Sequence, residues 1–190
     1  MVNFWRSLRF TIVFAILLGL LYPLVITGIG NLLFPFQAQG SIVHWQGRAV
    51  GSQLIAQSVT APGLFHPRPS AVDYVATRSG GSNLGPTNPE LLAEVKRNLQ
   101  TVEQENPGVP VSAIPPEMVE SSASGLDPDI SVQDALIQVP RIAKASGLSQ
   151  SWLKDLINRS EQRPVLSSWE KPMVNVMQLN LAVLRGTGRS

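Results

Sequence analysis

Cysteine is absent from this chain of 190 residues, and basic and acidic residues nearly balance. Without cysteine the protein has no disulfide bonds, no thiolate metal ligands and no cysteine nucleophile, although this absence does not fix the compartment in which it folds. The 15 basic and 13 acidic residues give a formal net charge of +2 and are scattered along the chain. We therefore expect no nucleic acid partner, because no segment is basic enough to follow a row of phosphates.

Histidine is scarce as well, which narrows the catalytic and metal chemistry open to the chain. The two histidines, His44 and His66, and the dispersed carboxylates show no ligand spacing, so no metal site is expected. A membrane-anchored extracytoplasmic hydrolase, with Ser70 or Ser124 as nucleophile, is the alternative that remains open. Neither serine has the strand-turn-helix setting of a nucleophile elbow, so we expect no catalytic residue.

A long uncharged segment dominates the N-terminal part of the chain. Between Arg9 and Arg48 there is no Asp, Glu, Lys or Arg, and residues 10–33 (FTIVFAILLGLLYPLVITGIGNLL) are almost continuously apolar. Roughly 20 such residues cross a bilayer as a helix, so a transmembrane helix is predicted at residues 10–34. A core helix of a soluble protein would have a polar face, and a cleaved signal peptide would have a shorter apolar region.

The charges that flank this helix predict its orientation. Arg6 and Arg9 precede it, whereas no Lys or Arg follows until Arg48. Positive flanks stay in the cytoplasm, so we predict a cytoplasmic N-terminus at residues 1–9 and one extracytoplasmic, periplasmic domain at residues 35–190. Within the span, small residues and a proline could let another helix approach, although an ordinary lipid-facing anchor fits equally well. These helix-packing candidates are Ala15, Gly19, Pro23 and Gly28.

The remainder of the sequence predicts a mixed α+β domain. Residues 61–89 are so rich in Gly, Pro and Ser that we expect a long structured loop. Pro140 should kink or divide the helix in which it lies. Residues 173–184 favour a helix, with a strand pattern as the rival. The other predicted elements are strands at 41–43, 49–50 and 54–55 and helices at 88–106, 131–147 and 149–161.

The glycine-rich stretch SGGSNLG at residues 79–85 is the segment most similar to a phosphate-binding loop. Consecutive backbone amides on flexible glycines can surround an oxyanion. A Walker loop would end in Gly-Lys-Ser/Thr after a strand, whereas here Leu84-Gly85-Pro86 follows. The composition therefore favours a structural loop over a nucleotide site.

Four longer segments taken together resemble one known family. They are GSQLIAQ at residues 51–57, FHPRPS at 65–70, SGGSNLGPTNP at 79–89 and SASGLDPDIS at 122–131. With the N-terminal anchor they resemble, in order and spacing, the C subunit of the Kdp-type potassium-transporting ATPase. The similarity continues near the end of the chain, in VNV at 174–176 and LNL at 179–181.

The resemblance implies a non-catalytic accessory subunit of a bacterial inner-membrane complex that imports potassium at high affinity by hydrolysing ATP. The implied partners are a channel-like potassium-binding subunit, a catalytic P-type ATPase subunit and a small hydrophobic subunit. ATP and potassium would be handled by the complex, with no cofactor bound directly by this chain. The family is also described as a catalytic chaperone that raises the ATP affinity of the ATPase subunit.

The predicted topology bears on that chaperone role. A domain outside the cell does not reach cytoplasmic ATP, so an effect on ATP affinity has to be coupled through the membrane part. We therefore expect the domain to cap the outer mouth of the channel-like subunit, with direct ATP contact through the glycine-rich loop as the rival. The residues that these motifs mark for partner or nucleotide contact are Gln57, Arg68, Ser79, Gly80, Gly81, Ser82, Asn83, Gly85, Ser124, Gly125 and Asp127.

Overall fold

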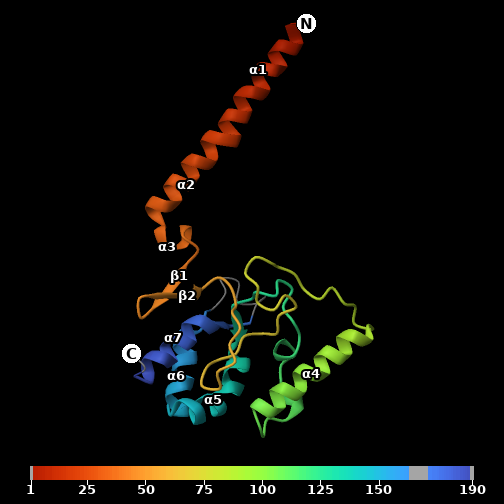
Figure 1. Cartoon of the computed structure of the whole chain (residues 1–190), viewed down its shortest axis with the longest axis vertical. Helices are drawn as coiled ribbons and strands as arrows, with labels where there is room; N and C mark the ends of the chain where they lie inside the picture. The colour runs from red at the N-terminus through yellow and green to blue at the C-terminus, as the bar shows by residue number, and fades with distance from the viewer. Residues whose placement is uncertain (1, 163–170, 189–190) are drawn as a thin grey trace. The chain divides into compact units, whose positions relative to one another are not determined.

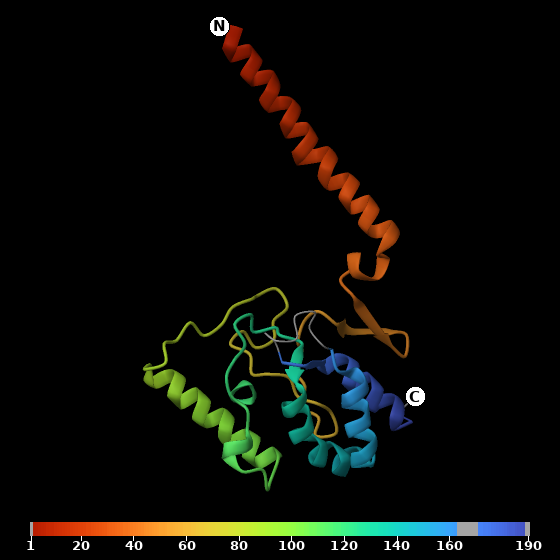
Figure 2. The same ribbon diagram turned by 180° about the vertical axis from the view of Figure 1, so that it is seen from behind.

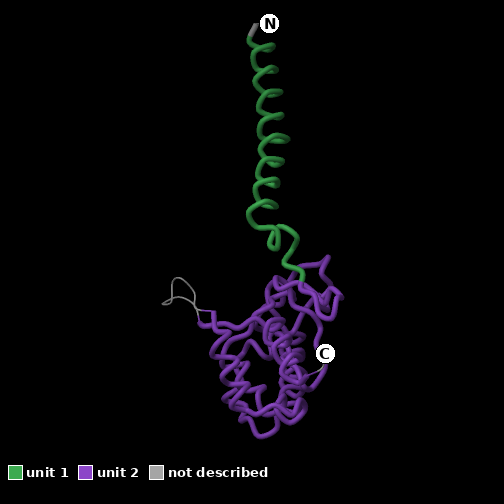
Figure 3. The backbone as a smooth tube through the Cα atoms, turned by 90° about the vertical axis from the view of Figure 1, so that its left-hand side faces the viewer, with its two compact units in different colours: residues 1–42 green, residues 43–190 purple. Residues whose placement is uncertain are grey.

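A computed structural model describes residues 2–162 and 171–188 of the chain. Two compact units make up the chain, Met1–Ile42 and Val43–Ser190, which are coloured separately in Figure 3. One N-terminal candidate membrane helix precedes a region that contains both helices and strands. The α+β class predicted from the sequence is therefore confirmed.

The first unit is a long helix followed by a single helical turn. Its segment Asn3–Leu33 is long and apolar enough to cross a membrane, and none of its most apolar stretch is buried within the chain. The helix begins at Val2, so it extends into the residues predicted to precede the span. The elements, labelled in Figure 1 where space allows, are α1 (Val2–Ile16), the π turn η1 (Leu17–Leu21), α2 (Tyr22–Leu33) and α3 (Pro35–Ala38).

The π turn in this helix has a local cause, Pro23. Proline has no N–H, and in an α-helix its ring clashes with the carbonyl four residues earlier, here that of Gly19. The helix widens over Leu17–Leu21, and the Tyr22 amide bonds to the Leu17 carbonyl five residues back. Such a local π adjustment accommodates a proline in a membrane helix, so the helix continues on both sides of it.

A β-hairpin opens the second unit, as the sequence predicts. Strands β1 (Ile42–Trp45) and β2 (Arg48–Ser52) pair with each other. The two residues between them, Gln46 and Gly47, have φ angles of 52° and 76°. Positive φ at both positions is typical of a type I′ turn, whose twist matches that of the strands. The predicted strand at residues 54–55 is wrong, because these residues lie in a turn.

The predicted loop is also present: residues 53–88 contain neither helix nor strand. The helices that follow begin at side chains that accept a hydrogen bond from the first turn, namely Asn88, Ser131, Ser149 and Asn175. Their bounds are α4 (Pro89–Glu105), α5 (Val132–Ser146), α6 (Gln150–Ser160) and α7 (Val176–Gly186), with short 3₁₀ turns η2 (Val111–Ala113) and η3 (Pro116–Met118).

Two predictions left alternatives that the structure narrows. Of the kink or division expected at Pro140, division does not occur, because α5 continues as one helix; Pro140 lies on its exposed side, where water can satisfy the carbonyl that loses its partner. The segment predicted as helix with strand as the rival is both, because β4 (Met173–Asn175) leads directly into α7. Strand β4 pairs antiparallel with β3 (Asp129–Ser131), which the sequence did not predict, and places Val174 opposite Ile130.

Two hydrophobic cores stabilise the second unit. The larger core joins α5, α6, α7, the β3–β4 pair and the fully buried Phe65. The smaller one is formed by Val102 of α4 with Met118 and Val119. Figures 1 and 2 show α4 apart from the other three helices. Leu92 of α4 continues its apolar spacing but is 60% exposed, because the second core covers only part of that face.

Two carboxamide side chains hold the backbone of the long loop. The N–H of Phe65 donates to Asn180 Oδ1 at 2.7 Å, and Asn180 Nδ2 donates to the Phe65 carbonyl at 2.9 Å. At the next residue, the N–H of His66 donates to Gln138 Oε1 at 2.8 Å, and Gln138 Nε2 donates to the His66 carbonyl at 3.1 Å. The amides thus satisfy buried backbone groups that have no neighbouring strand.

Candidate functional site

The glycine-rich loop lies against the segment that precedes β3, so two of the motifs singled out in the sequence meet. The Gly80 amide donates to the Ser124 carbonyl at 2.9 Å, and Ser79 Oγ donates to the same oxygen at 3.2 Å. A Cβ on Gly81 would lie 3.3 Å from the Ala123 carbonyl oxygen. Because the Gly80 amide is already bonded, this part of the loop is held as structure and does not offer a ring of free amides.

Gly125 is the position at which the two segments come closest. It has φ +66°, and a Cβ there would lie 2.5 Å from Val72 Cγ2 and 2.9 Å from the Gly80 carbonyl oxygen. Its own carbonyl accepts a hydrogen bond from Ser70 Oγ at 2.6 Å. That hydroxyl also accepts from the amides of Val72 and Tyr74. Glycine is required at residue 125 both by the backbone conformation and by the lack of space.

The other marked residues of the loop are not brought into this contact. Asn83 adopts a left-handed conformation with φ 56°. The Gly85 carbonyl accepts from the Asn88 amide at 2.9 Å in the turn that leads into α4. Ser82, which precedes Asn83, is half-buried. The structure therefore gathers Ser79, Gly80 and Gly81 with Ser124 and Gly125, and separates this group from the second half of the loop.

Arg68 and Asp127 form an ion pair beside the two segments. Arg68 Nη1 lies 3.2 Å from Asp127 Oδ2, and both side chains are partly exposed. Asp127 Oδ1 also accepts from the Asp129 amide at 3.2 Å, which fixes the turn into β3. Gln57 lies elsewhere, with its carboxamide packed over Gly51, where a Cβ would overlap it. These contacts explain the motif residues as supports for loop geometry.

The serines considered as nucleophiles have structural roles in this arrangement. Ser70 makes the three bonds described above, and Ser124 Oγ accepts from the Leu126 amide at 3.1 Å. The ring nitrogens of His66 lie 3.1 Å from Glu105 Oε2 and 3.1 Å from the Ala61 carbonyl oxygen. Within residues 2–162 and 171–188, neither serine is hydrogen bonded to a histidine. The hydrolase alternative is therefore not supported.

The helix-packing candidates of the first unit present an open surface. A Cβ added to Gly19 or Gly28 would meet no atom of the chain within 4 Å. Ala15 is exposed, and Pro23 follows the π turn that it causes. Nothing within the described chain covers these positions, so their part in helix packing stays a prediction.

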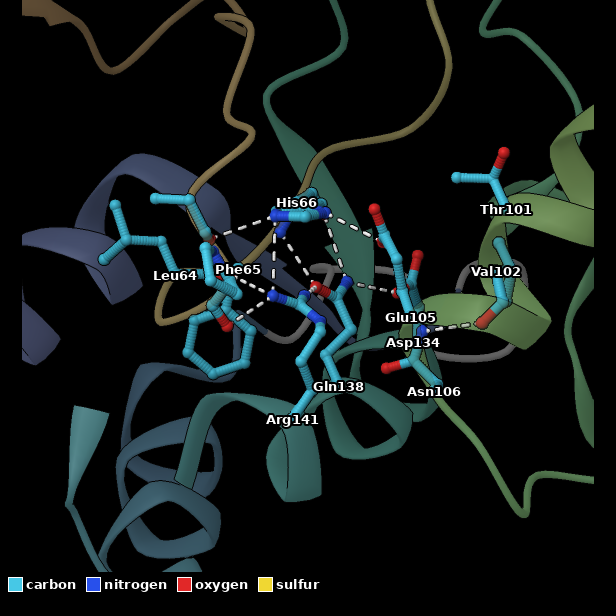
Figure 4. Close-up of polar contacts among 12 residues, drawn as sticks. Leu64, Phe65, His66, Thr101, Val102, Glu105, Asn106, Asp134, Gln138 and Arg141 are labelled. Carbon is cyan, nitrogen blue, oxygen red and sulfur yellow. Dashed lines mark hydrogen bonds and ion pairs between the residues drawn. The ribbon is translucent and has the colours of Figure 1, made fainter. Parts of the chain in front are cut away.

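A polar cluster that the sequence analysis did not assemble lies between the long loop, α4 and α5 (Figure 4). Gln138 Nε2 donates to Asp134 Oδ1 at 2.8 Å in addition to its bond with the His66 carbonyl. Arg141 Nη1 donates to the carbonyls of Pro62 and Leu64, and Nη2 donates to Gln138 Oε1 at 2.6 Å. Through these bonds α5 fixes both the position and the direction of the loop that carries His66.

Burial perturbs the acid and base of this cluster. Asp134 is 1% exposed, and burial raises the pKa of its carboxyl to about 7, with a further rise from the nearby Glu117. The hydrogen bond from Gln138 and the charges of Arg68 and Arg141 oppose that rise. Burial likewise lowers the pKa of Arg141, opposed by Glu105 and Asp134. A carboxyl that ionises near neutral pH inside a domain is a candidate for function as well as for structure.

One signal in the sequence could have identified this cluster. Asp134, Gln138 and Arg141 are spaced by four and three residues, which places three polar side chains on one face of α5. Asp134 also lies three residues after the N-cap residue Ser131, the spacing of a capping box. In the structure its amide does donate to Ser131 Oγ, but its carboxylate bonds to Gln138. The partners on α4 and in the loop could not be read from spacing, since they come from distant parts of the chain.

Comparison with known proteins identifies the family. A family model described as the c chain of the K⁺-transporting ATPase matches residues 4–185. The potassium-transporting ATPase KdpC subunit of Caldanaerobacter subterraneus subsp. tengcongensis is 49% identical over 94% of this chain and 93% of its own length. The KdpC subunits of Methylobacterium nodulans and Koribacter versatilis are 46% and 42% identical over 94% of this chain and 96% and 92% of theirs. The chain therefore belongs to the KdpC family of K⁺-transporting ATPase subunits.

Proposed function

We propose that this protein is a non-catalytic accessory subunit of an ATP-driven, high-affinity potassium import complex in a bacterial inner membrane. The observation that carries the proposal is the family match over residues 4–185, which includes both the candidate membrane helix and the second unit. Relatives of similar length carry the name of a potassium-transporting ATPase subunit. A membrane helix joined to one compact α+β unit suits a protein that attaches to other subunits.

The partners in this proposal are a channel-like potassium-binding subunit, a catalytic P-type ATPase subunit and a small hydrophobic subunit. The candidate span would contact them in the membrane, where Gly19 and Gly28 leave an open surface. Outside the membrane, the second unit would cap the ion entrance of the channel-like subunit. The second unit would thereby act on the assembly of the complex and on the entry of ions.

An effect on ATP affinity would be indirect in this scheme. The Gly80 amide, a leading candidate for contact with a phosphate, is bonded to the Ser124 carbonyl, which favours a structural role for the loop. ATP and potassium would be bound by the partner subunits, with no cofactor held by this chain. Coupling between two states of the complex can change ATP affinity without any direct contact with the nucleotide.

Cysteine labelling of intact cells tests the orientation on which the proposal depends. The chain has no native cysteine, and Thr77 is an exposed residue of the long loop, so Thr77→Cys introduces a single accessible thiol. A membrane-impermeant thiol reagent should label it from outside. Asn3→Cys, near the positively charged end of the span, should be labelled only after permeabilisation.

The reverse pattern would contradict the proposed topology. Labelling of Thr77→Cys only in permeabilised cells, with Asn3→Cys accessible from outside, would place the long loop in the cytoplasm. Direct contact with the ATPase subunit or its nucleotide would then become the leading mechanism.

A further inference from the structure

A polar cavity of about 220 Å³ lies beside the loop that His66 occupies, between α4 and α5. Four of its polar lining residues come from the last turns and C-cap of α4: Asn98, Thr101, Glu105 and Asn106. Their spacing of three, four and one residues places them along one side of the helix. Asp134 of α5 lines the same cavity.

Asn98 and Asn106 both line this cavity, and each bonds its side-chain nitrogen to a backbone carbonyl. Asn98 Nδ2 donates to the Val119 carbonyl at 2.8 Å, and Asn106 Nδ2 donates to the Val102 carbonyl at 3.1 Å. Asn106 is 5% exposed, and its Oδ1 has no hydrogen-bond partner in the part of the chain that the structure describes. A buried acceptor without a donor is costly unless a ligand or water satisfies it.

Three further polar side chains that line the cavity, Thr101, Asp134 and Glu105, also carry acceptor oxygens. Thr101 Oγ1 donates a hydrogen bond to the Arg97 carbonyl, so the lone pairs of this oxygen remain available as acceptors. Asp134 and Glu105 contribute carboxylates. One oxygen of Asp134 is bonded to Gln138, and one oxygen of Glu105 is bonded to His66. Amide, hydroxyl and carboxylate oxygens together make an environment that suits a cation.

Among the basic side chains nearby, His66 lines the cavity. Arg68 does not line it: this side chain pairs with Asp127, and its buried Nε has no hydrogen-bond partner in the part of the chain that the structure describes. The ring nitrogens of His66 face Glu105 and the Ala61 carbonyl. The Nη groups of Arg141 donate to two loop carbonyls and to Gln138, and Arg141 does not line this cavity. No anion-binding donor set is therefore assembled there.

We propose that this cavity binds a partly hydrated monovalent cation through Asn106 Oδ1, Asp134 and the oxygen atoms of α4. Its volume leaves room for an ion with several waters, since a water takes up about 30 Å³ in the liquid. A tightly held divalent ion fits less well, because no group of three His, Cys, Asp or Glu side chains suited to a metal occurs among residues 2–162 and 171–188. Neutral oxygens with one or two carboxylates suit a weakly bound singly charged ion.

Thermal unfolding of the full chain in mild detergent tests the site. Potassium chloride, or sodium chloride in a parallel series, replaces choline chloride at constant ionic strength up to about 0.3 M, and tryptophan fluorescence reports the Tm. We expect a Tm that rises by about 3 °C or more and saturates, because only a bound ion stabilises the folded state in this way. An absent rise, or one that does not saturate, would mean that the cavity holds only water and would overturn the proposal.

Three variants test whether the rise in Tm comes from this cavity. Asn106→Ala removes the unpartnered oxygen and Asp134→Asn removes the buried charge, so each should abolish the rise. Glu103→Gln makes the same change of charge as Asp134→Asn at an exposed position of α4 outside the cavity and should retain it. An equal rise in all three variants would place the cation elsewhere and reject this site.

The response should also depend on pH, because protons compete with a cation for Asp134. The charged groups that surround it are Arg141 on its own helix, Glu117 from η3, Arg68 and His66 from the loop, and Glu105 from α4. The Tm rise should be larger at about pH 8 than at about pH 6. A rise independent of pH would argue against Asp134 as a ligand.

Discussion

At the scale of single residues, Gly125 is the position where a small change should have the largest effect on folding. Gly125→Ala introduces a Cβ 2.5 Å from Val72 Cγ2 and forces a non-glycine residue to φ +66°. Overpacking and left-handed strain together should lower the free energy of unfolding by about 2–4 kcal/mol. Thermal unfolding should show a Tm lower by about 5–15 °C.

A matched control lies in the glycine-rich loop. A Cβ on Gly85 would meet no atom within 4 Å, and its φ is not in the left-handed range. Gly85→Ala should therefore leave the Tm almost unchanged. An equal loss of Tm in Gly125→Ala and Gly85→Ala would show that an added methyl group destabilises both positions alike. The argument from local geometry at residue 125 would then be wrong.

Asp134 should make stability depend on pH with a definite sign. Its pKa is about 7 in the folded chain and near 3.9 in an unfolded one, so between these values the folded state holds a proton that the unfolded state has lost. The free energy of unfolding should fall as the pH rises through this window and then level off. Asp134→Asn should remove this fall, which amounts to at most about 4 kcal/mol.

Unfolding of both proteins in choline chloride at several pH values measures the effect. Groups other than Asp134 titrate in both chains and cancel in the difference. The variant should gain stability relative to its parent from about pH 4 to pH 8. A difference that stays constant with pH would mean that the carboxyl is ionised throughout and that its burial is compensated.

At the scale of elements, the open face of the candidate membrane helix should matter for assembly of the proposed complex. Gly28→Leu adds bulk at a helix-packing candidate, and it should reduce the recovery of the partner subunits when the complex is purified in mild detergent. Gly30→Leu is the control, because it makes the same change about 200° around α2, where a Cβ also meets no atom of the chain. Equal recovery of partners with both variants would indicate an ordinary lipid-facing anchor.

Elements were predictable where their signals are local. Three helices could be predicted from their N-cap residues, because an N-cap is a short-range hydrogen bond within the sequence. These residues are Asn88, Ser131 and Ser149. The β3–β4 pair was missed, since a three-residue strand is stabilised by a partner more than 40 residues away. The sequence left open whether Pro140 divides its helix, because division depends on how the freed carbonyl is satisfied in the folded chain.

The same distinction applies to the candidate site. The contact of Gly80 with Ser124 and the contacts that join the long loop to α4 and α5 bring together residues 39 to 79 positions apart, and no periodicity reveals such pairs. The motif segments were recognised as a set, but the reason for each residue became visible only when the loops met. Gly125 is the clearest case, since its neighbours Ser70 and Gly80 belong to two other motif segments.

At the scale of the whole molecule, the two cores predict two levels of local stability. Helix α4 is held mainly by Val102, Met118 and Val119, whereas α5, α6 and α7 share a larger core with many fully buried side chains. Backbone amides of α4 should therefore exchange with solvent sooner than those of the other three helices. Hydrogen exchange read by mass spectrometry measures this in the full chain.

Two truncations test that division. Val102→Ala should speed exchange in α4 and leave α6 almost unchanged. Val183→Ala, which opens a cavity in the larger core, should speed exchange across α5, α6 and α7. Uniform acceleration by both variants would mean that the second unit opens as one cooperative whole.

The carboxamide bonds at Phe65 have a consequence for biosynthesis. Phe65 is held by Asn180, which follows it by 115 residues, and His66 by Gln138, which follows it by 72. A ribosome has to complete nearly all of the second unit before the long loop can lock into place. Until then the long loop lacks the side chains that hold its backbone. In the proposed orientation, with the second unit outside the cell, this late locking would leave the nascent segment free to pass through a narrow translocation pore before it folds.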